Sequence, residues 1–183
     1  MAAARAPSRR SSVVSGRKME CTWKKNSTNA EISKTFWDRG TLYALRGTFI
    51  AGATERSLEK LQQFSRKRLL GDRVPYVVEA SPEGNMAHLS AESALYCRIF
   101  TEGLFGINPT GLRSFEFTPR LPSGWGAMAL RSVKAFGGCF DIEVKRAGDT
   151  FGVRIFNEEE EFSSEIILPG ASISIDLGKD PEP

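Results

Sequence analysis

The chain has 183 residues, of which 40% are hydrophobic and 26% are charged, a composition typical of one soluble globular domain or of part of a larger protein. No apolar run reaches the length of a membrane-spanning helix, so the sequence predicts no membrane partner. Residues 1–35 carry a net charge of +6 and residues 36–183 a net charge of −3. The segment expected to fold therefore lacks the broad basic surface of a nucleic-acid-binding protein.

Residues 1–35 are rich in Arg, Ser and Ala and show no sustained hydrophobic period, which predicts a disordered basic tail. The tail contains no apolar core of a secretory signal, and with no membrane segment the sequence favours a cytoplasmic location. Cys97 falls in an apolar helical pattern and Cys139 in a strand pattern, so both thiols are expected to be buried. With widely spaced cysteines and a single histidine, the sequence predicts no metal site and no cofactor.

Three segments between residues 36 and 105 have hydrophobic residues at helical spacing. Residues 36–53 and 90–105 carry few charges, which predicts two largely buried helices, the second with Ser90 as its N-cap. Residues 54–71 combine one apolar stripe with a charged remainder, which predicts an outward-facing helix with Thr54 as its N-cap and an end before Gly71. The expected order is an inner, an outer and a second inner helix.

After the turn-like segment 106–111 the hydrophobic period changes from 3.6 to 2, which indicates β-strands. The strands are expected at 112–121, 128–136, 139–148, 150–157, 162–170 and 172–177. Tight turns at Gly137-Gly138 and Gly148-Asp149 and a solvated run of four glutamates at 158–161 separate several of them. The pattern is that of an antiparallel meander or sandwich.

The loop between the second and third helices is the best candidate for a functional site. Helices joined by short loops run antiparallel, so the first and third helices are expected to begin at the same end. Residues 36–40, "FWDRG", then lie beside residues 77–90, where polar groups meet the electropositive helix N-termini. The side chains that we expect to converge are Trp37, Asp38, Arg39, Glu79, Glu83, His88 and Glu92.

Each of these residues also has a purely structural interpretation. Glu79 could be an ordinary exposed carboxylate, and Glu83 and Glu92 could assist a turn and a helix start. His88 could bond a buried carbonyl, Trp37 could be packing, and Asp38–Arg39 could be a local ion pair. Asp141 and Glu143 alternate outward on a strand and are expected to face solvent, and Trp125 is expected to close the end of a sheet.

Four segments between residues 75 and 146 form a recognisable series: "VVEASPEGNMAHLSAES", "TEGLFGINPTG", "FEFTPRLPSGW" and "FGGCFDIEVKR". In this order they resemble the C-terminal end of bacterial six-hairpin glycosidases, the (α/α)6-barrel glycoside hydrolases, nearest to the α-L-rhamnosidase type. In that family a glutamate-bearing loop precedes the last inner helix, which ends at a "GI-P-G" turn before an antiparallel C-terminal domain. The likeness covers residues 36–177 by architecture.

What the resemblance implies is hydrolysis of a glycosidic bond with inversion, in which one carboxylic acid protonates the leaving oxygen and a carboxylate activates water. Carried over by position, Glu79 matches the family's general base, with Glu83 as the alternative. His88 and Trp37 match places that contact sugar, so carbohydrate is the expected partner. Glu92, Asp38 and Arg39 join them as candidate substrate-binding residues.

The implied fold class is α+β: α-helical hairpins forming a partial (α/α)6 toroid, followed by a C-terminal antiparallel β-sandwich or meander. The expected divisions are a basic tail (1–35), the partial barrel segment (36–106), the β domain (107–178) and a tail (179–183). A complete barrel needs twelve helices, on the order of 200–300 residues. The sequence therefore predicts the inactive C-terminal fragment of a hydrolase, which is expected to self-associate through exposed apolar helix faces. The alternative is a non-catalytic carbohydrate-binding or interaction module centred on the β domain.

Overall fold

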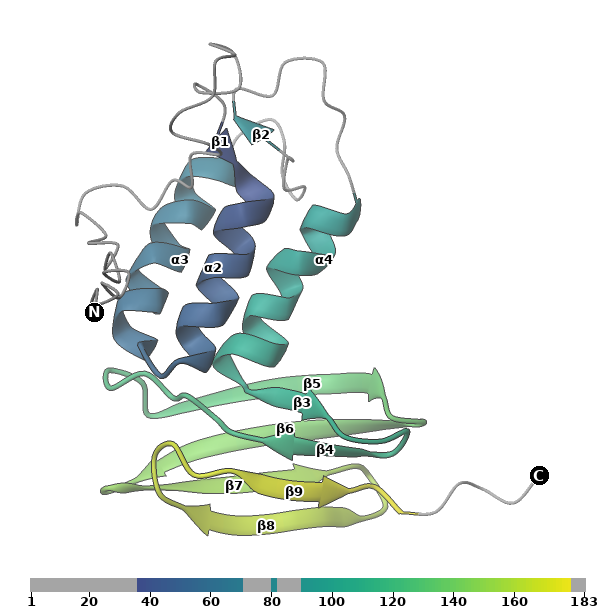
Figure 1. Ribbon diagram of the computed structural model, residues 1–183. Helices are drawn as coiled ribbons and strands as arrows, with labels where there is room; N and C mark the ends of the chain where they lie inside the picture. Colours follow the sequence, from purple (N-terminus) through teal and green to yellow (C-terminus); the bar gives the residue numbers. More distant parts are fainter. Residues whose placement is uncertain (1–35, 71–79, 82–89, 179–183) are drawn as a thin grey trace, which may run out of the picture.

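The computed structural model describes residues 36–70, 80–81 and 90–178 of the chain. Figure 1 shows the helices grouped together at one end and the larger β-sheets at the other. In chain order the elements are β1 (Phe36–Trp37), α2 (Asp38–Ile50), α3 (Thr54–Arg68), β2 (Ala80–Ser81), α4 (Ser90–Arg98), the π-helix η1 (Ile99–Leu104), β3 (Ile107–Pro109), β4 (Ser114–Phe117), β5 (Ala127–Ala135), β6 (Gly138–Ala147), β7 (Thr150–Phe156), β8 (Glu161–Ile167) and β9 (Ile173–Asp176).

The predicted fold class is wrong, because the described residues form no partial (α/α)6 toroid of helical hairpins. They form three short α-helices, the last of them continued by η1, and a larger β-rich part with a three-stranded and a four-stranded antiparallel sheet. Helix α3 closes against α4: the hydroxyls of Ser65 and Tyr96 lie 2.7 Å apart, and the Phe64 and Tyr96 rings stack. The helices therefore pack against one another as a small bundle and do not continue a ring.

Helix α2 buries one face only, although its few charges predicted a largely buried helix. Leu42, Leu45 and Phe49 are buried, and they repeat at the spacing of one helical stripe. Tyr43 and Ile50 are 48% and 51% exposed. Low charge in the sequence therefore did not mean burial on all sides.

Helix α4 is also one-sided. Leu95 is buried, whereas Ala91, Ala94 and Cys97 are exposed. Alanine is compatible with either face of a helix, so the apolar composition of this segment was a poor guide to its burial. Both predictions of buried thiols are wrong, because Cys97 and Cys139 are exposed.

Helix α3 is amphipathic, as predicted from its single apolar stripe. Leu61 and Phe64 are buried, and most of its charged side chains point to solvent. The prediction of its N-cap is wrong by one residue: Thr54 is the first helical residue, and Ala53 is the N-cap, with no side-chain hydrogen bond. The helix ends at Arg68, close to the predicted end.

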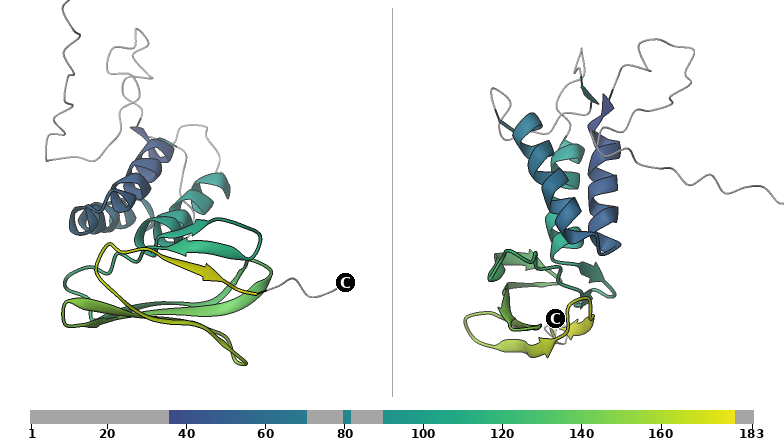
Figure 2. Two further views of the ribbon diagram at one scale, coloured as in Figure 1. Left: turned by 60° about the horizontal axis from the view of Figure 1, so that its bottom comes forward. Right: turned by 90° about the vertical axis from the view of Figure 1, so that its left-hand side faces the viewer.

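Strands β3 to β9 form two sheets that face each other (Figure 2). The strand order is β3-β4-β9 in one sheet and β5-β6-β7-β8 in the other, and all neighbouring strands are antiparallel. Phe115 and Phe117 of β4 and Phe140, Ile142 and Ile155 of the larger sheet are buried between them. The Phe115 and Phe140 rings stack with centroids 5.9 Å apart, so aromatic packing joins the two sheets.

Strands β4 to β9 lie within or close to the six segments with alternating hydrophobicity, whereas β3 lies in the segment predicted as a turn. The turn between β5 and β6 lies at Phe136-Gly137, one residue before the predicted Gly137-Gly138, and both of its residues have positive φ, the backbone of a type I′ hairpin. The first three glutamates of the run, residues 158–160, are exposed in the turn between β7 and β8, and the fourth begins β8. In this turn the Asn157 side-chain oxygen accepts hydrogen bonds from the backbone N–H groups of Glu159 and Glu160.

Two residues fix the junction between the helices and the sheets. A Cβ atom on Gly106 would lie 2.1 Å from the carbonyl oxygen of Thr118, so only glycine permits this close approach. Arg120 donates from Nη1 to the carbonyl oxygen of Gly103 (2.8 Å) and from Nη2 to that of Ile50 (3.4 Å). It thereby satisfies carbonyls at the C-terminal ends of two helices, and its burial lowers the pKa of the guanidinium.

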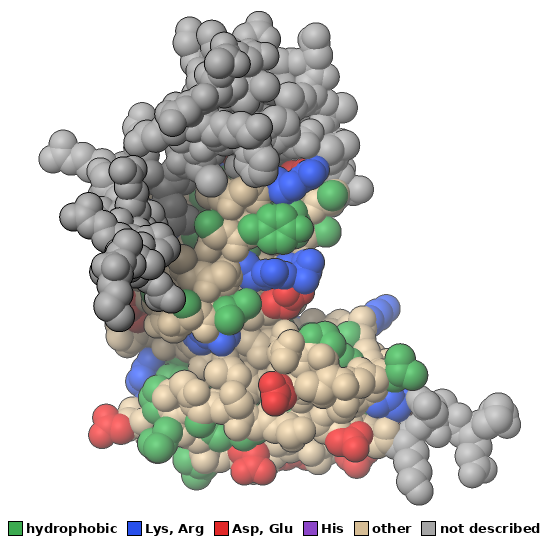
Figure 3. Space-filling model, in the orientation of Figure 1, with side chains coloured by type: hydrophobic (Ala, Val, Ile, Leu, Met, Phe, Trp, Pro, Cys, Tyr) green, Lys and Arg blue, Asp and Glu red, His purple; other side chains and the backbone are tan. Residues whose placement is uncertain are grey.

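The face shown in Figure 3 has hydrophobic side chains interspersed with basic and acidic ones along the helices. Arg46 lies over the Tyr43 ring, 5.5 Å from its centroid, and pairs with Glu102 at 2.7 Å. Glu102 also pairs with Arg98 one turn earlier.

Among the described helices none combines the length and the apolar character needed to cross a membrane.

Candidate functional site

The predicted meeting of the first helix start with the following loop is confirmed by backbone pairing. Strand β1 pairs antiparallel with β2, with Phe36 opposite Ser81 and Trp37 opposite Ala80. The pairing holds the segment that directly follows Glu79 against the residues that directly precede α2. The side chains of Glu79, Glu83 and His88 lie outside the described residues, as does that of Trp37, whose backbone is described.

A buried ion pair joins the starts of α2 and α4. The Nε and Nη2 atoms of Arg39 both lie 2.6 Å from Oε1 of Glu92. The Glu92 side chain is fully buried, whereas that of Arg39 is 43% exposed. A buried carboxylate needs such charge-assisted hydrogen bonds, because otherwise its desolvation would not be compensated. Both residues are in the first turn of their helices, so the predicted convergence of the two helix starts is confirmed.

A second ion pair joins the start of α2 to the end of α3. Arg68 Nε donates a hydrogen bond of 3.1 Å to Oδ1 of Asp38, and the Asp38 side chain is 2% exposed. Asp38 is at a helix N-terminus and Arg68 at a helix C-terminus, so each charge has the sign that the helix dipole favours. We call the four residues Asp38, Arg39, Arg68 and Glu92 the polar rim.

Arg68 was missed in the sequence. It follows Leu61 by seven residues and Phe64 by four, so it continues the buried stripe of α3 rather than the charged face. An arginine in register with an apolar stripe predicts a buried or half-buried partner, and that signal was present. The purely local reading of Asp38–Arg39 as an ion pair is not what the described contacts give, since each residue has a partner on another helix.

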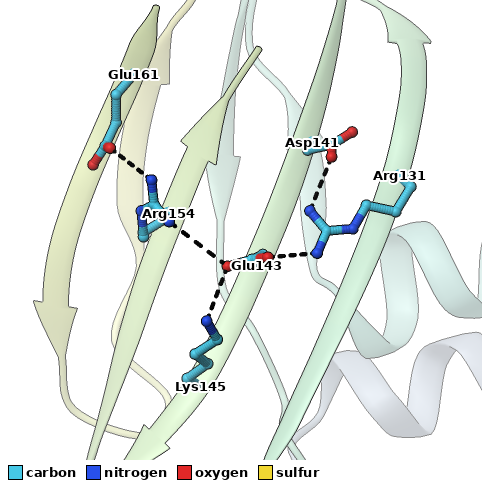
Figure 4. Close-up of polar contacts among 6 residues, drawn as sticks. All are labelled: Arg131, Asp141, Glu143, Lys145, Arg154 and Glu161. Carbon is cyan, nitrogen blue, oxygen red and sulfur yellow. Dashed lines mark hydrogen bonds and ion pairs between the residues drawn. The ribbon is translucent and has the colours of Figure 1, made fainter. Parts of the chain in front are cut away.

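A second polar cluster covers the outer face of the four-stranded sheet (Figure 4). Its members come from all four strands: Arg131, Asp141, Glu143, Lys145, Arg154 and Glu161. Arg131 pairs with both Asp141 and Glu143, and Arg154 links Glu143 to Glu161. Asp141 and Glu143 face outward as predicted, but both are partly covered, and the Glu143 side chain is only 15% exposed.

The cluster carries three positive and three negative charges, and its carboxylates are held in the ionised form. The backbone N–H of Ser132 and the guanidinium of Arg131 lower the pKa of Asp141. Arg131 and then Lys145 lower the pKa of Glu143, and Arg154 lowers that of Glu161. A carboxylic acid that must donate a proton needs the opposite shift, so this cluster supports the sheet and does not suit acid catalysis.

The cavities found in the described part of the chain lie away from the polar rim. One of about 610 Å³ opens at the end of the large sheet, between Ser132, Asp141 and Phe156. Two neighbouring ones, of about 500 and 410 Å³, lie at the junction of the helices and the sheets and share Leu121 and Phe151. Because these cavities contain none of the predicted catalytic or substrate-binding residues, their size alone does not make them the candidate site.

Among the described residues no group of three or more His, Cys, Asp or Glu side chains could hold a metal ion. Trp125 is 37% exposed. Comparison with protein-family models, with curated proteins and with solved structures finds no match to this chain. Any functional conclusion therefore depends on the residues themselves.

Proposed function

We propose that this chain is the C-terminal part of an inverting glycoside hydrolase and that the polar rim contributes to its sugar site. The observation that carries the proposal is the pairing of β1 with β2, which holds the segment after Glu79 beside Trp37. The two helices that start there bring Arg39 and the buried carboxylate of Glu92 to the same place. Charged hydrogen-bonding groups next to an aromatic residue suit the recognition of a polyhydroxylated ring.

In the proposed reaction, Glu79 acts as the general base that takes a proton from water, with Glu83 as the alternative. An inverting hydrolase places its two carboxyl groups roughly 6.5–9.5 Å apart, so that water fits between one of them and the sugar. The rim carboxylates Asp38 and Glu92 accept hydrogen bonds from guanidinium groups, which suits orientation of a substrate rather than donation of a proton. The general acid is therefore not assigned to the polar rim.

The proposal does not depend on a toroid, which the described residues do not form. It predicts that the chain binds a neutral monosaccharide and does not cleave glycosides, because the rim supplies contacts and no general acid. His88 and Trp37 are the proposed sugar contacts. Self-association through the exposed helix faces that include Tyr43 and Ile50 remains part of the proposal.

The experiment is a calorimetric titration of the full chain with a panel of neutral monosaccharides that includes L-rhamnose and D-glucose. We expect saturable binding of at least one sugar, weakened in Trp37→Ala, with no release of p-nitrophenol from the matching p-nitrophenyl glycosides. A panel in which no sugar binds would reject the proposed function.

A second candidate, a non-catalytic carbohydrate-binding module on the β-sheets, is favoured by the exposed Trp125 ring. An exposed aromatic side chain can serve as a platform for a sugar ring. The same titration separates the two candidates: Trp125→Ala weakens binding only for the module, and Trp37→Ala only for the hydrolase site.

A further inference from the structure

Two cavities adjoin where the turn between α2 and α3 lies next to the sheets (Figure 1). Their volumes are about 500 and 410 Å³, and they share the lining residues Gly52, Thr54, Leu121, Phe151 and Pro169. Leu121 and Phe151 are buried members of the hydrophobic core, so they give the shared part an apolar wall. We call the two cavities together the junction groove.

The charged side chains that line the junction groove are three arginines and one glutamate: Arg56, Arg120, Arg146 and Glu55. Their formal charge at neutral pH is therefore +2. The Glu55 carboxylate accepts a hydrogen bond of 2.6 Å from the backbone N–H of Ser123, so it is held by the chain itself. An excess of positive charge in a hollow with an apolar wall attracts an anion.

Two of these arginines have no carboxylate partner among the described residues. Arg120 and Arg146 are half-buried, and all the hydrogen bonds that they donate go to backbone carbonyl oxygens. By contrast, the half-buried Arg46 and Arg68 each pair with a carboxylate. Burial lowers the pKa of Arg120, and no acidic group raises it again. Two partly desolvated guanidinium groups without a counter-ion leave positive charge that a bound anion can compensate.

Both guanidinium groups keep N–H donors that a ligand can use. Nη1 of Arg146 and Nε of Arg120 donate no hydrogen bond within the described part of the chain, and neither atom is closed to solvent. The start of α3 adds to the attraction, because its N-cap, Ala53, lines the groove and makes no side-chain hydrogen bond. The first N–H groups of a helix have no acceptor within the helix and carry partial positive charge.

The charge of the junction groove selects the chemical class of the ligand. A phosphate monoester carries close to two negative charges at neutral pH and has three oxygens that accept hydrogen bonds, whereas a carboxylate carries one charge. Guanidinium groups bind phosphate oxygens with charge-assisted hydrogen bonds. The apolar wall formed by Leu121 and Phe151 suits the organic part of such an ester.

We infer that the junction groove binds a phosphate monoester, with its phosphoryl group held by Arg56 and Arg146 and its organic part against Leu121 and Phe151. Arg120, from the adjoining cavity, strengthens the positive field. This site is separate from the proposed sugar site, because no residue of the polar rim lines either cavity.

The test is a calorimetric titration of the full chain at neutral pH and low salt with phenyl phosphate, inorganic phosphate, benzoate and phenol. Phenyl phosphate should bind saturably, more tightly than inorganic phosphate and at least about threefold more tightly than benzoate, because it combines two charges with an apolar ring. Phenol, which has the ring without the charge, should show no saturable binding. Added salt should weaken the binding of phenyl phosphate.

Substitutions of the arginines test the assigned contacts. Arg146→Gln should weaken the binding of phenyl phosphate at least about tenfold, and Arg56→Gln about three- to tenfold. Arg66→Gln is the charge-matched control, since Arg66 is exposed on the same helix and does not line the groove. It should change the affinity less than about twofold.

Substitution of Glu55 should have the opposite effect. Glu55→Gln removes the negative charge but keeps an oxygen that can accept the Ser123 N–H, so it should strengthen binding about two- to fivefold. Glu59→Gln, at an exposed position one turn later and outside the groove, is its control and should leave the affinity unchanged.

Arg56 and Glu55 are exposed, so their variants decide the question even if Arg146→Gln does not fold. The inference is overturned if phenyl phosphate does not bind saturably, if phenol binds as well, or if neither Arg56→Gln nor Glu55→Gln changes the affinity. Equal affinity for benzoate and phenyl phosphate would overturn the assignment of a phosphate monoester. None of these results bears on the sugar titration, which tests the proposed function separately.

Discussion

The guanidinium of Arg120 and the carbonyl oxygen of Gly103 lie 2.8 Å apart, and this hydrogen bond joins the end of the last helical segment to the residues that follow β4. Arg120→Ala removes this bond and the one to Ile50, which leaves helix-end carbonyls without a partner. We expect a loss of about 2–3 kcal/mol in the free energy of unfolding, measured by urea denaturation. Arg56→Ala, at an exposed position of α3, should change it by less than about 0.5 kcal/mol, and equal effects would contradict this role of Arg120.

Gly106 is a position where close approach, rather than backbone conformation alone, requires glycine. Gly106 and Gly170 both have positive φ, but a Cβ atom would be 2.1 Å from Thr118 at the first and would meet no atom within 4 Å at the second. Gly106→Ala should therefore cost about 3 kcal/mol or more, and Gly170→Ala only about 1 kcal/mol. Thermal unfolding of both variants measures the difference, and similar melting temperatures would refute the packing argument.

The ion pairs on the large sheet predict a dependence of stability on pH. The pKa values of Asp141, Glu143 and Glu161 are lowered in the folded state, so their contribution is present above the ordinary carboxyl pKa of about 4 and is lost as the pH falls through the lowered values. Arg131→Gln should destabilise the protein at pH 7 and have little effect at pH 2.

Lys134→Gln is the charge-matched control for this experiment, because Lys134 is exposed on the same strand. Urea denaturation at pH 7 and pH 2 gives the comparison. If the difference between Arg131→Gln and the wild type were the same at both pH values, the ion pairs would not be its source.

The exposed thiols give a simple test of the surface. Cys97 and Cys139 are both exposed, so each should react with a maleimide in the native protein, without denaturant. Mass spectrometry after a short exposure, followed by peptide mapping, identifies the labelled positions. Reaction at these two positions only after unfolding would show that the thiols are buried, as the sequence had predicted.

The sequence predicted the strands well, because most strands of the sandwich bury alternate residues and the alternation is visible in the sequence. Strand β3 was not predicted, because it has only three residues and ends in Pro109. The wrong prediction of a toroid came from the family resemblance. The hydrophobic periodicity of the sequence by itself predicts only three helices. What the pattern could not supply was the closure of α3 on α4 through Ser65 and Tyr96.

Part of the candidate site could also be predicted. If the first and third helices run parallel, their N-termini lie side by side. This argument predicted that Arg39 and Glu92 lie close together, and in the structure they form an ion pair. The partner of Asp38 could not be read from the loop, because Arg68 reaches it from the far end of another helix. The roles proposed for Glu79, Glu83 and His88 stay predictions.

The most direct measurement of the central claim is a map of backbone amide chemical-shift changes when the full chain is titrated with the best-bound neutral monosaccharide. A sugar held at the polar rim should shift the amides in the first turns of α2 and α4, around Arg39 and Glu92, and leave those around Trp125 unchanged. Shifts confined to the β-sheets, or no saturable shifts with any sugar, would contradict the claim.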